Sequence, residues 1–115
     1  DYALDVRVDE STKGLAKPAQ AAFKAAVRLT KTDPNGACAT WQALTRDVEP
    51  TAALAFNLGL CQEMQGDLNS AVDWYGDAQR QGLRSKAVAD ALERIASHRR
   101  ALSEWTARQA ASGSE

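Results

Sequence analysis

Histidine and cysteine are scarce in this 115-residue chain, and their scarcity excludes several kinds of chemistry. His98 is the only histidine, and the two cysteines, Cys38 and Cys61, do not form a CxxC pair. A structural zinc site needs about four ligands, so the sequence excludes a site of this kind. The sequence also has no glycine-rich phosphate-binding loop and no Gly-x-Ser-x-Gly nucleophile motif. We therefore expect no metal, no cofactor and no enzymatic activity.

A strong charge bias and long apolar runs are absent as well. The formal net charge is −1, whereas a domain dedicated to nucleic-acid binding is normally clearly basic. No apolar run approaches the roughly 20 residues of a membrane-spanning helix, and no signal-peptide pattern stands at the front. We expect neither nucleic-acid binding nor direct membrane insertion. Because the chain begins at Asp1 rather than Met, we interpret it as a mature fragment or as a piece of a longer protein.

What the chain has in quantity is alanine and other helix-forming residues, interrupted by short breaker segments. Alanine suits closely packed helices and is poor material for a β-sandwich. The breakers at 33–36, 49–51 and 66–67 divide the chain. They predict helices at about Pro18–Thr32, Ala37–Asp47, Ala52–Gln65, Asn69–Gly82 and Lys86–Gln109. Short connections make consecutive helices antiparallel, so the predicted fold class is an all-α array of helical hairpins. By composition, residues 111–115 are predicted to be a disordered tail.

The first residues follow a different pattern from the rest. In YALDVRV, the side chains of Tyr2, Leu4, Val6 and Val8 alternate with Ala, Asp and Arg, as in a strand with one buried face. A strand needs a neighbour, because a lone one leaves its backbone groups unpaired. Two interpretations stay open: the last strand of a domain further upstream, or an extended arm that pairs with another chain or lies along a groove. We treat residues 1–17 as this extended arm and its linker.

Residues 51–79, TAALAFNLGLCQEMQGDLNSAVDWYGDAQ, resemble a tetratricopeptide repeat (TPR). That family repeats a helix–turn–helix of about 34 residues with the signature W-x2-L-G-x2-Y…A-x3-F…P. The residues that match are Leu58 and Gly59 for the L-G pair, Gly66 in the turn, Ala71 and Tyr75 for A-x3-F, and the small residue Ala78. One repeat earlier, Ala37 and Trp41 fall in register with Ala71 and Tyr75. The departures are Ala55 for Trp, Gln62 for Tyr and Leu83 for Pro.

The resemblance implies a short right-handed TPR-like superhelix over residues 18–110. It would consist of one clear repeat, a degenerate unit before it and a capping helix after it. In such a repeat, Gly59 and Ala71 let two helices approach closely, while Leu58 and Tyr75 fill the space beside them.

The resemblance also implies a binding surface, because the first helix of each TPR hairpin lines a concave groove that holds extended peptides or helices. The residues that it places in this groove are Phe56, Asn57, Leu60, Glu63 and Met64. The spacing of Phe56, Leu60 and Met64 makes one apolar stripe. One interpretation is a groove that takes an apolar or amphipathic segment. The other is that neighbouring helices or the upstream linker already cover the stripe.

The family's packing would place Cys38 and Cys61 on neighbouring helices of adjacent hairpins. They are either a disulfide or two small buried core residues. A disulfide would indicate an oxidising compartment such as a periplasm.

Two functional hypotheses follow. The first is a non-catalytic protein–protein interaction scaffold that binds a peptide or helix segment in the groove. The second is a structural or self-assembly module that packs against a neighbouring domain or against copies of itself, with a homo-oligomer formed through the N-terminal arm. The residue usage is typical of bacterial proteins, in which such arrays occur in envelope proteins and lipoproteins, and this association favours the periplasm or envelope over the cytoplasm.

Overall fold

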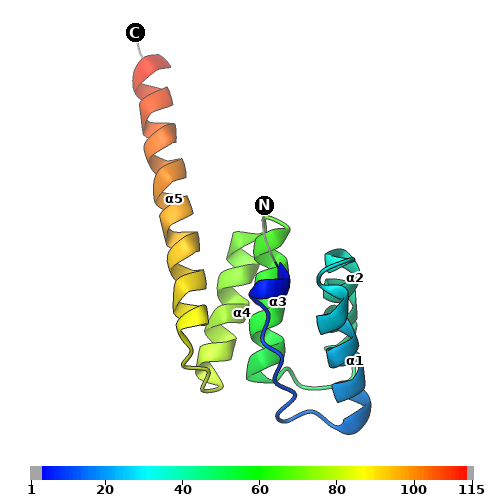
Figure 1. The fold of residues 1–115 in the computed structure, drawn as a ribbon. Coiled ribbons are helices and arrows are strands. Elements are labelled where there is room, and N and C mark those ends of the chain that lie inside the picture. Colours follow the sequence, from blue (N-terminus) through cyan, green and yellow to red (C-terminus); the bar gives the residue numbers. More distant parts are fainter. Residues whose placement is uncertain (1–3, 114–115) are drawn as a thin grey trace.

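The computed structural model describes residues 4–113, and in this range all regular secondary structure is helical, with no strand. The all-α fold class is therefore confirmed for the described residues. The elements, labelled in Figure 1, are η1 (Leu4–Val6, one turn of 3-10 helix), α1 (Lys17–Leu29), α2 (Pro34–Leu44), α3 (Ala52–Met64), α4 (Leu68–Arg80) and α5 (Lys86–Gly113). None of these helices is both long and apolar enough to cross a membrane.

Side-chain caps set the starts of three helices. Helix α2 begins at Pro34, inside the predicted breaker at 33–36 and not at Ala37 as predicted, because Asp33 caps it. Asp33, Thr51 and Asp67 each cap a helix, accepting a hydrogen bond from the backbone N–H three residues later at 2.9, 3.3 and 3.1 Å. Gly66 and Gly82 follow α3 and α4 with φ values of +87° and +99°, a conformation that side chains disfavour. At the C-terminal end, α5 continues through 111–113, which the composition placed in a disordered tail; the alanines at 110 and 111 favour this extension of the helix.

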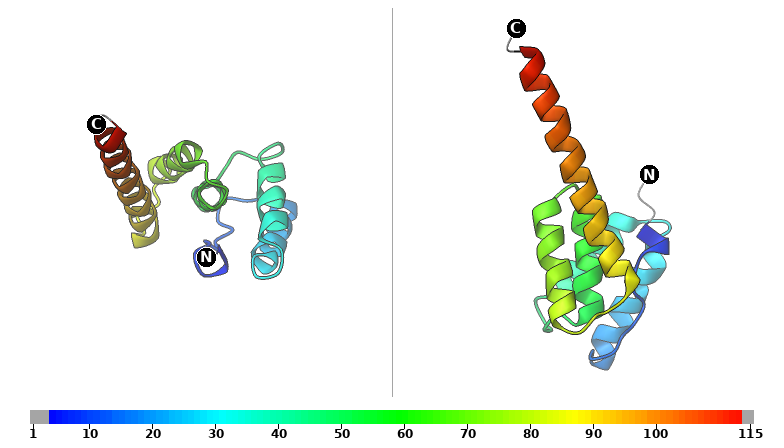
Figure 2. Two further views of the ribbon diagram at one scale, coloured as in Figure 1. Left: turned by 90° about the horizontal axis from the view of Figure 1, so that it is seen from above. Right: turned by 90° about the vertical axis from the view of Figure 1, so that its left-hand side faces the viewer.

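Helices α1 and α2 form one hairpin and α3 and α4 form the next, with α5 packed against α4. Figure 2 shows the helices following one another in chain order, with α5 at one side and α1 and α2 at the other. The N-terminal turn η1 lies beside α3, in the space between α1 and α5. Only the first half of α5 meets the body; the second half projects beyond it.

Helix α3 is the centre of the core, and every residue from Ala53 to Cys61 on it is buried. Across the α3–α4 contact, the ring of Tyr75 lies directly against Gly59, where an added Cβ would stand only 2.5 Å from the ring. The small side chains of Ala71 and Ala78 are buried too. In the first hairpin, the rings of Phe23 and Trp41 pack with centroids 5.9 Å apart. The core thus runs without a break from α1 to α4.

Cys38 of α2 and Cys61 of α3 form a disulfide, with their Cα atoms 5.7 Å apart. Of the two interpretations of the cysteines, the structure has the bonded one. The disulfide fastens the first hairpin to the second, because α2 and α3 belong to different hairpins.

The N-terminal segment departs from the predicted strand. Tyr2 lies outside the described residues, and Leu4 begins a turn in which its carbonyl accepts the N–H groups of Arg7 at 3.0 Å and Val8 at 3.2 Å. Leu4 is 2% exposed whereas Val6 is 75% exposed, so the two do not share a buried face as the alternation required. The reason is that the helices offer no sheet edge, and the backbone pairs locally instead.

Candidate functional site

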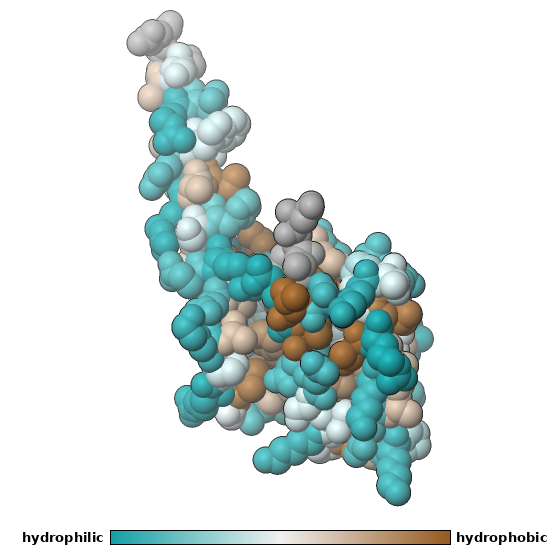
Figure 3. Space-filling view, viewed as in Figure 1, coloured by the Kyte–Doolittle hydropathy of each residue, from teal (hydrophilic) through white to brown (hydrophobic). Residues whose placement is uncertain are grey.

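The chain's own N-terminus lies against three of the predicted groove residues on α3, Phe56, Asn57 and Leu60. Phe56, Asn57 and Leu60 are buried, while Glu63 and Met64 are partly buried. This part of the N-terminus is the segment Leu4–Asp9, which we call the arm; it passes along α3 and is joined to α1 through the exposed residues 10–14, which we call the linker. Figure 3 shows hydrophobic atoms gathered in the middle of this face, where η1 crosses α3.

The side chain of Asn57 hydrogen-bonds to the main chain of the arm. The N–H of Asp9 donates to Asn57 Oδ1 at 2.8 Å, and Asn57 Nδ2 donates to the carbonyl of Asp9, also at 2.8 Å. The Asn57 amide is fully buried, and a buried amide left without partners costs about 1–3 kcal/mol. Because both bonds go to main-chain atoms, any residue except proline, which has no N–H, satisfies Asn57 at this position.

The rest of the arm is held by apolar contact. Leu4 belongs to the same buried cluster as Phe56 and Leu60, and Val8 packs against that cluster in part. Helix α5 forms a wall beside the arm. A cavity of about 160 Å³ remains between the three elements, lined by Val6 and Arg7 of the arm, Phe56 and Leu60 of α3, and Ala87, Asp90 and Arg94 of α5. The groove therefore has α3 as its floor and α5 as one side.

Glu63, which the resemblance placed in the groove, links three helices in the structure. Its Oε1 accepts the hydroxyl of Tyr75 at 2.7 Å, and its two carboxylate oxygens accept Nε and Nη2 of Arg94, each at 2.9 Å. The Glu63 side chain is 10% exposed and that of Arg94 30%. These contacts join α3 to α4 and to α5. Sequence reasoning missed this role, because Arg94 lies 31 residues away and no local pattern connects the two.

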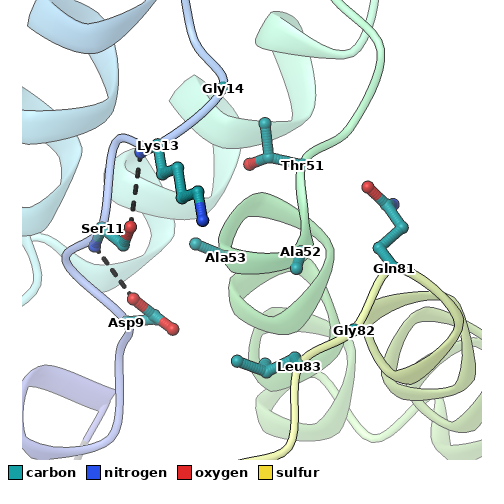
Figure 4. Close-up of a pocket in the computed structure, with 10 residues that line it drawn as sticks. All are labelled: Asp9, Ser11, Lys13, Gly14, Thr51, Ala52, Ala53, Gln81, Gly82 and Leu83. Carbon is teal, nitrogen blue, oxygen red and sulfur yellow. Dashed lines mark hydrogen bonds between the residues drawn. The ribbon is translucent and has the colours of Figure 1, made fainter.

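A second cavity, of about 420 Å³, lies at the foot of the groove (Figure 4). One wall is the linker, which holds its shape by local bonds from the Ser11 N–H to Asp9 Oδ1 and from the Lys13 N–H to Ser11 Oγ. The opposite walls are the first turn of α3 and the turn between α4 and α5. Gly14 has a φ of +89° and brings the linker close to Thr51, since a Cβ on Gly14 would stand 3.1 Å from Thr51 Cγ2. The linker thus bridges the foot of the groove without filling it.

No group of three or more His, Cys, Asp or Glu in the described part of the chain could hold a metal ion. His98 is exposed on α5.

Comparison with known proteins places the helices in a family. A family model described as "Domain of unknown function (DUF6340)" matches residues 23–104. This range runs from within α1 into α5, so it includes the disulfide, Asn57, the second hairpin and most of the first, while the arm precedes it. No curated protein and no solved structure matches the chain. Since the matched range is well over half of the sequence, the chain belongs to the DUF6340 family.

Proposed function

We propose that this chain is a non-catalytic, TPR-like scaffold that binds an extended protein segment in the groove between α3 and α5. The observation that carries the proposal is the pair of hydrogen bonds by which buried Asn57 grips the backbone of Asp9. The chain thereby recognises a non-helical peptide segment in this groove, and a segment of a partner protein can use the same contacts.

Three packing features support the TPR-like arrangement within this proposal. Two hairpins stand side by side, a disulfide joins them, and a capping helix follows. The close approach of Tyr75 to Gly59 agrees with the roles that the resemblance implies for these two residues. A right-handed superhelix is the continuation of this stacking, and we propose it on that basis.

The proposed groove combines two kinds of recognition. Asn57 binds main-chain atoms and so contributes affinity without reading a side chain. The apolar cluster of Phe56 and Leu60 selects for a buried apolar side chain, the part that Leu4 takes in the arm. Main-chain bonds for affinity and pockets for specificity are the usual division in the recognition of extended peptides.

The test is to release the arm by proteolysis and to measure whether the groove binds it again as a free peptide. A protease site inserted between Glu10 and Ser11, two exposed residues of the linker, releases residues 1–10 after the chain has folded. A fluorescent peptide DYALDVRVDE is then titrated into the cleaved, washed protein and followed by anisotropy. We expect saturable binding, and binding weaker by on the order of 10-fold or more when the cleaved protein carries Asn57→Ala, since two buried hydrogen bonds are lost.

A scrambled peptide of the same composition is the matched control. If the cleaved protein keeps its helical circular dichroism but does not bind the peptide, the groove does not recognise segments in trans and the proposal is wrong.

A second candidate function, self-assembly, is favoured by the projecting half of α5. Val88 and Ile95 are buried on one stripe of α5, and the same stripe continues seven residues later to Leu102, which is 49% exposed, and to Trp105, which is 55% exposed. Light scattering tests this candidate: assembly through the stripe makes the mass of the wild type rise with concentration and leaves Leu102→Gln/Trp105→Gln monomeric. A monomeric wild type at all concentrations removes this candidate.

We also propose that the chain resides in an oxidising compartment such as a bacterial periplasm. The support is the Cys38–Cys61 disulfide, because such bonds persist mainly in oxidising environments. Alkylation of thiols in intact source cells tests it: two unmodified cysteines that react only after reduction agree with the proposal, and two freely alkylated cysteines contradict it.

A further inference from the structure

The arm occupies the groove in a way that a ligand would. It forms one turn of 3-10 helix and no strand pairing, places Leu4 in the hydrophobic core, and presents the main chain of Asp9 to Asn57 five residues later. Every one of these contacts is between the arm and helices that lie later in the chain. None of them depends on a covalent connection between the two.

The linker between the arm and α1 has few contacts with the rest of the molecule. Residues 10–14 are mostly exposed, and their backbone bonds are local, from Ser11 to Asp9, from Lys13 to Ser11 and from Leu15 to Thr12. Segments with exposed backbone and few apolar contacts open at low free-energy cost. The arm can therefore leave the groove by unfolding only the linker and itself, while the disulfide and the helices stay in place.

We infer that the arm is an internal ligand, and that a partner segment enters the groove only by displacing it. The inference rests on the proposed function and names its ligand: a segment with an apolar side chain placed as Leu4 is, five residues before a residue other than proline. A tethered ligand acts at an effective concentration of about millimolar when its linker is short. The apparent affinity for a free segment is reduced by the fraction of molecules whose groove is occupied.

Loosening the arm while leaving the groove intact tests this inference in the full-length chain. Leu4→Asp removes the buried anchor of the arm, whereas Leu102→Asp makes the same change at a 49% exposed position on the projecting half of α5, outside the arm and the groove. The probe is the fluorescent peptide DYALDVRVDE. We expect Leu4→Asp to bind the probe tighter than the wild type by on the order of 10- to 100-fold, the value of burying one leucine, and Leu102→Asp to bind as the wild type does.

Changes in the peptide test the ligand class on the same chain. A peptide with Asp9→Ala keeps the N–H and the carbonyl that Asn57 uses, so we expect it to bind the Leu4→Asp protein as well as the original probe. A peptide with Asp9→Pro lacks the N–H, and we expect it to bind at least 10-fold more weakly. Equal binding of the two peptides overturns the inferred ligand class.

Other outcomes separate this inference from the proposed function. If wild type and Leu4→Asp bind the probe equally, the arm is not a competitor and the inference is wrong, although the proposed function stands. If the folded Leu4→Asp chain and the cleaved protein both fail to bind, the proposed function fails as well. An intact wild-type dimer that Asn57→Ala abolishes would make a second copy's arm the occupant and overturn displacement in cis.

Circular dichroism checks that Leu4→Asp remains helical. If it does not, Leu4→Ala is the milder replacement, for which we expect the same direction of change with a smaller factor. A helical Leu4→Ala chain with wild-type affinity for the probe overturns the inference.

Discussion

At the scale of single residues, Gly59 sets how closely α3 and α4 approach. Its missing side chain leaves the space that the ring of Tyr75 fills, and that ring is fully buried and held by its hydroxyl on Glu63. The ring has little freedom to move away. The ring of Tyr75 also packs against that of Phe56, with centroids 5.6 Å apart. Gly59 therefore affects the groove as well as the core, because it sets the position of Tyr75, which packs against the groove residue Phe56.

We predict that Gly59→Ala destabilises the fold by about 1–3 kcal/mol, because the added methyl overpacks a rigid ring. Alanine's better helix propensity offsets up to about 1 kcal/mol of this. Gly76→Ala on α4 is the matched control: its Cβ would meet only the end of the Arg80 side chain at 3.4 Å, so it gains the propensity without the clash. In urea denaturation, the midpoint should be lower than in the wild type for Gly59→Ala and higher for Gly76→Ala. A raised midpoint for both would show that Tyr75 moves aside.

A second residue-scale prediction concerns the Glu63–Arg94 pair. Arg94→Ala leaves a largely buried carboxylate with only part of its partners, and we expect a loss of about 2–3 kcal/mol. The comparison is Arg100→Ala, which breaks a pair with Glu93 whose side chains are 62% and 70% exposed; such pairs contribute under about 1 kcal/mol. Thermal denaturation of both variants measures the difference, and equal losses would mean that burial of Glu63 does not matter.

At the scale of elements, α5 has two halves with different support. Val88, Ala91 and Ile95 bury the first half against the body, whereas Leu102 and Trp105 in the second half stay exposed. A helical segment without tertiary packing is marginal in water. The projecting half is thus held in shape mainly by its continuity with the buried half.

We predict that backbone amides of residues 100–112 exchange their hydrogens much faster than those of the buried half of α5 and of α3. Hydrogen–deuterium exchange with mass spectrometry measures this along the helix. Uniform protection along the whole of α5 would contradict the prediction for a monomer and would indicate that another chain covers the Leu102 and Trp105 stripe.

The elements also show which parts of the structure local sequence can predict. The start of α3 at Ala52 was predicted correctly, but α2 begins at Pro34, inside the segment 33–36 that was predicted to be a breaker. Asp33 caps α2 through an atom only three residues away, so the cap could have been found from local sequence. The strand at the N-terminus was wrong, because alternation predicts a strand only when an edge exists to pair with it. Asn57 was placed in the groove, but its partner Asp9 lies 48 residues away and no spacing rule connects them.

At the scale of the whole molecule, one covalent bond ties the two hairpins together. The Cys38–Cys61 disulfide closes a loop with a sequence separation of 23 residues that contains the passage from α2 to α3. The bond lowers the conformational entropy of the unfolded chain. It also keeps the first hairpin attached to α3 when other contacts loosen.

We predict that the double variant Cys38→Ala/Cys61→Ala loses about 3–4 kcal/mol of stability, the loop-entropy value for a closed loop of this length. Urea denaturation of the variant and of the oxidised wild type measures this, and the reduced wild type serves as a check that the bond rather than the side chains is responsible. Equal midpoints for the oxidised and reduced wild type would contradict it.

The projection of α5 also changes how the molecule behaves as a particle. The radius of gyration is 16.3 Å and the extents are 63 × 30 × 24 Å, whereas a compact chain of this length has a radius of gyration of about 13 Å. An elongated particle has a larger frictional coefficient, and so a larger hydrodynamic radius, than a sphere of equal mass. The monomer should therefore leave a gel-filtration column earlier than a globular protein of the same mass, without any association having taken place.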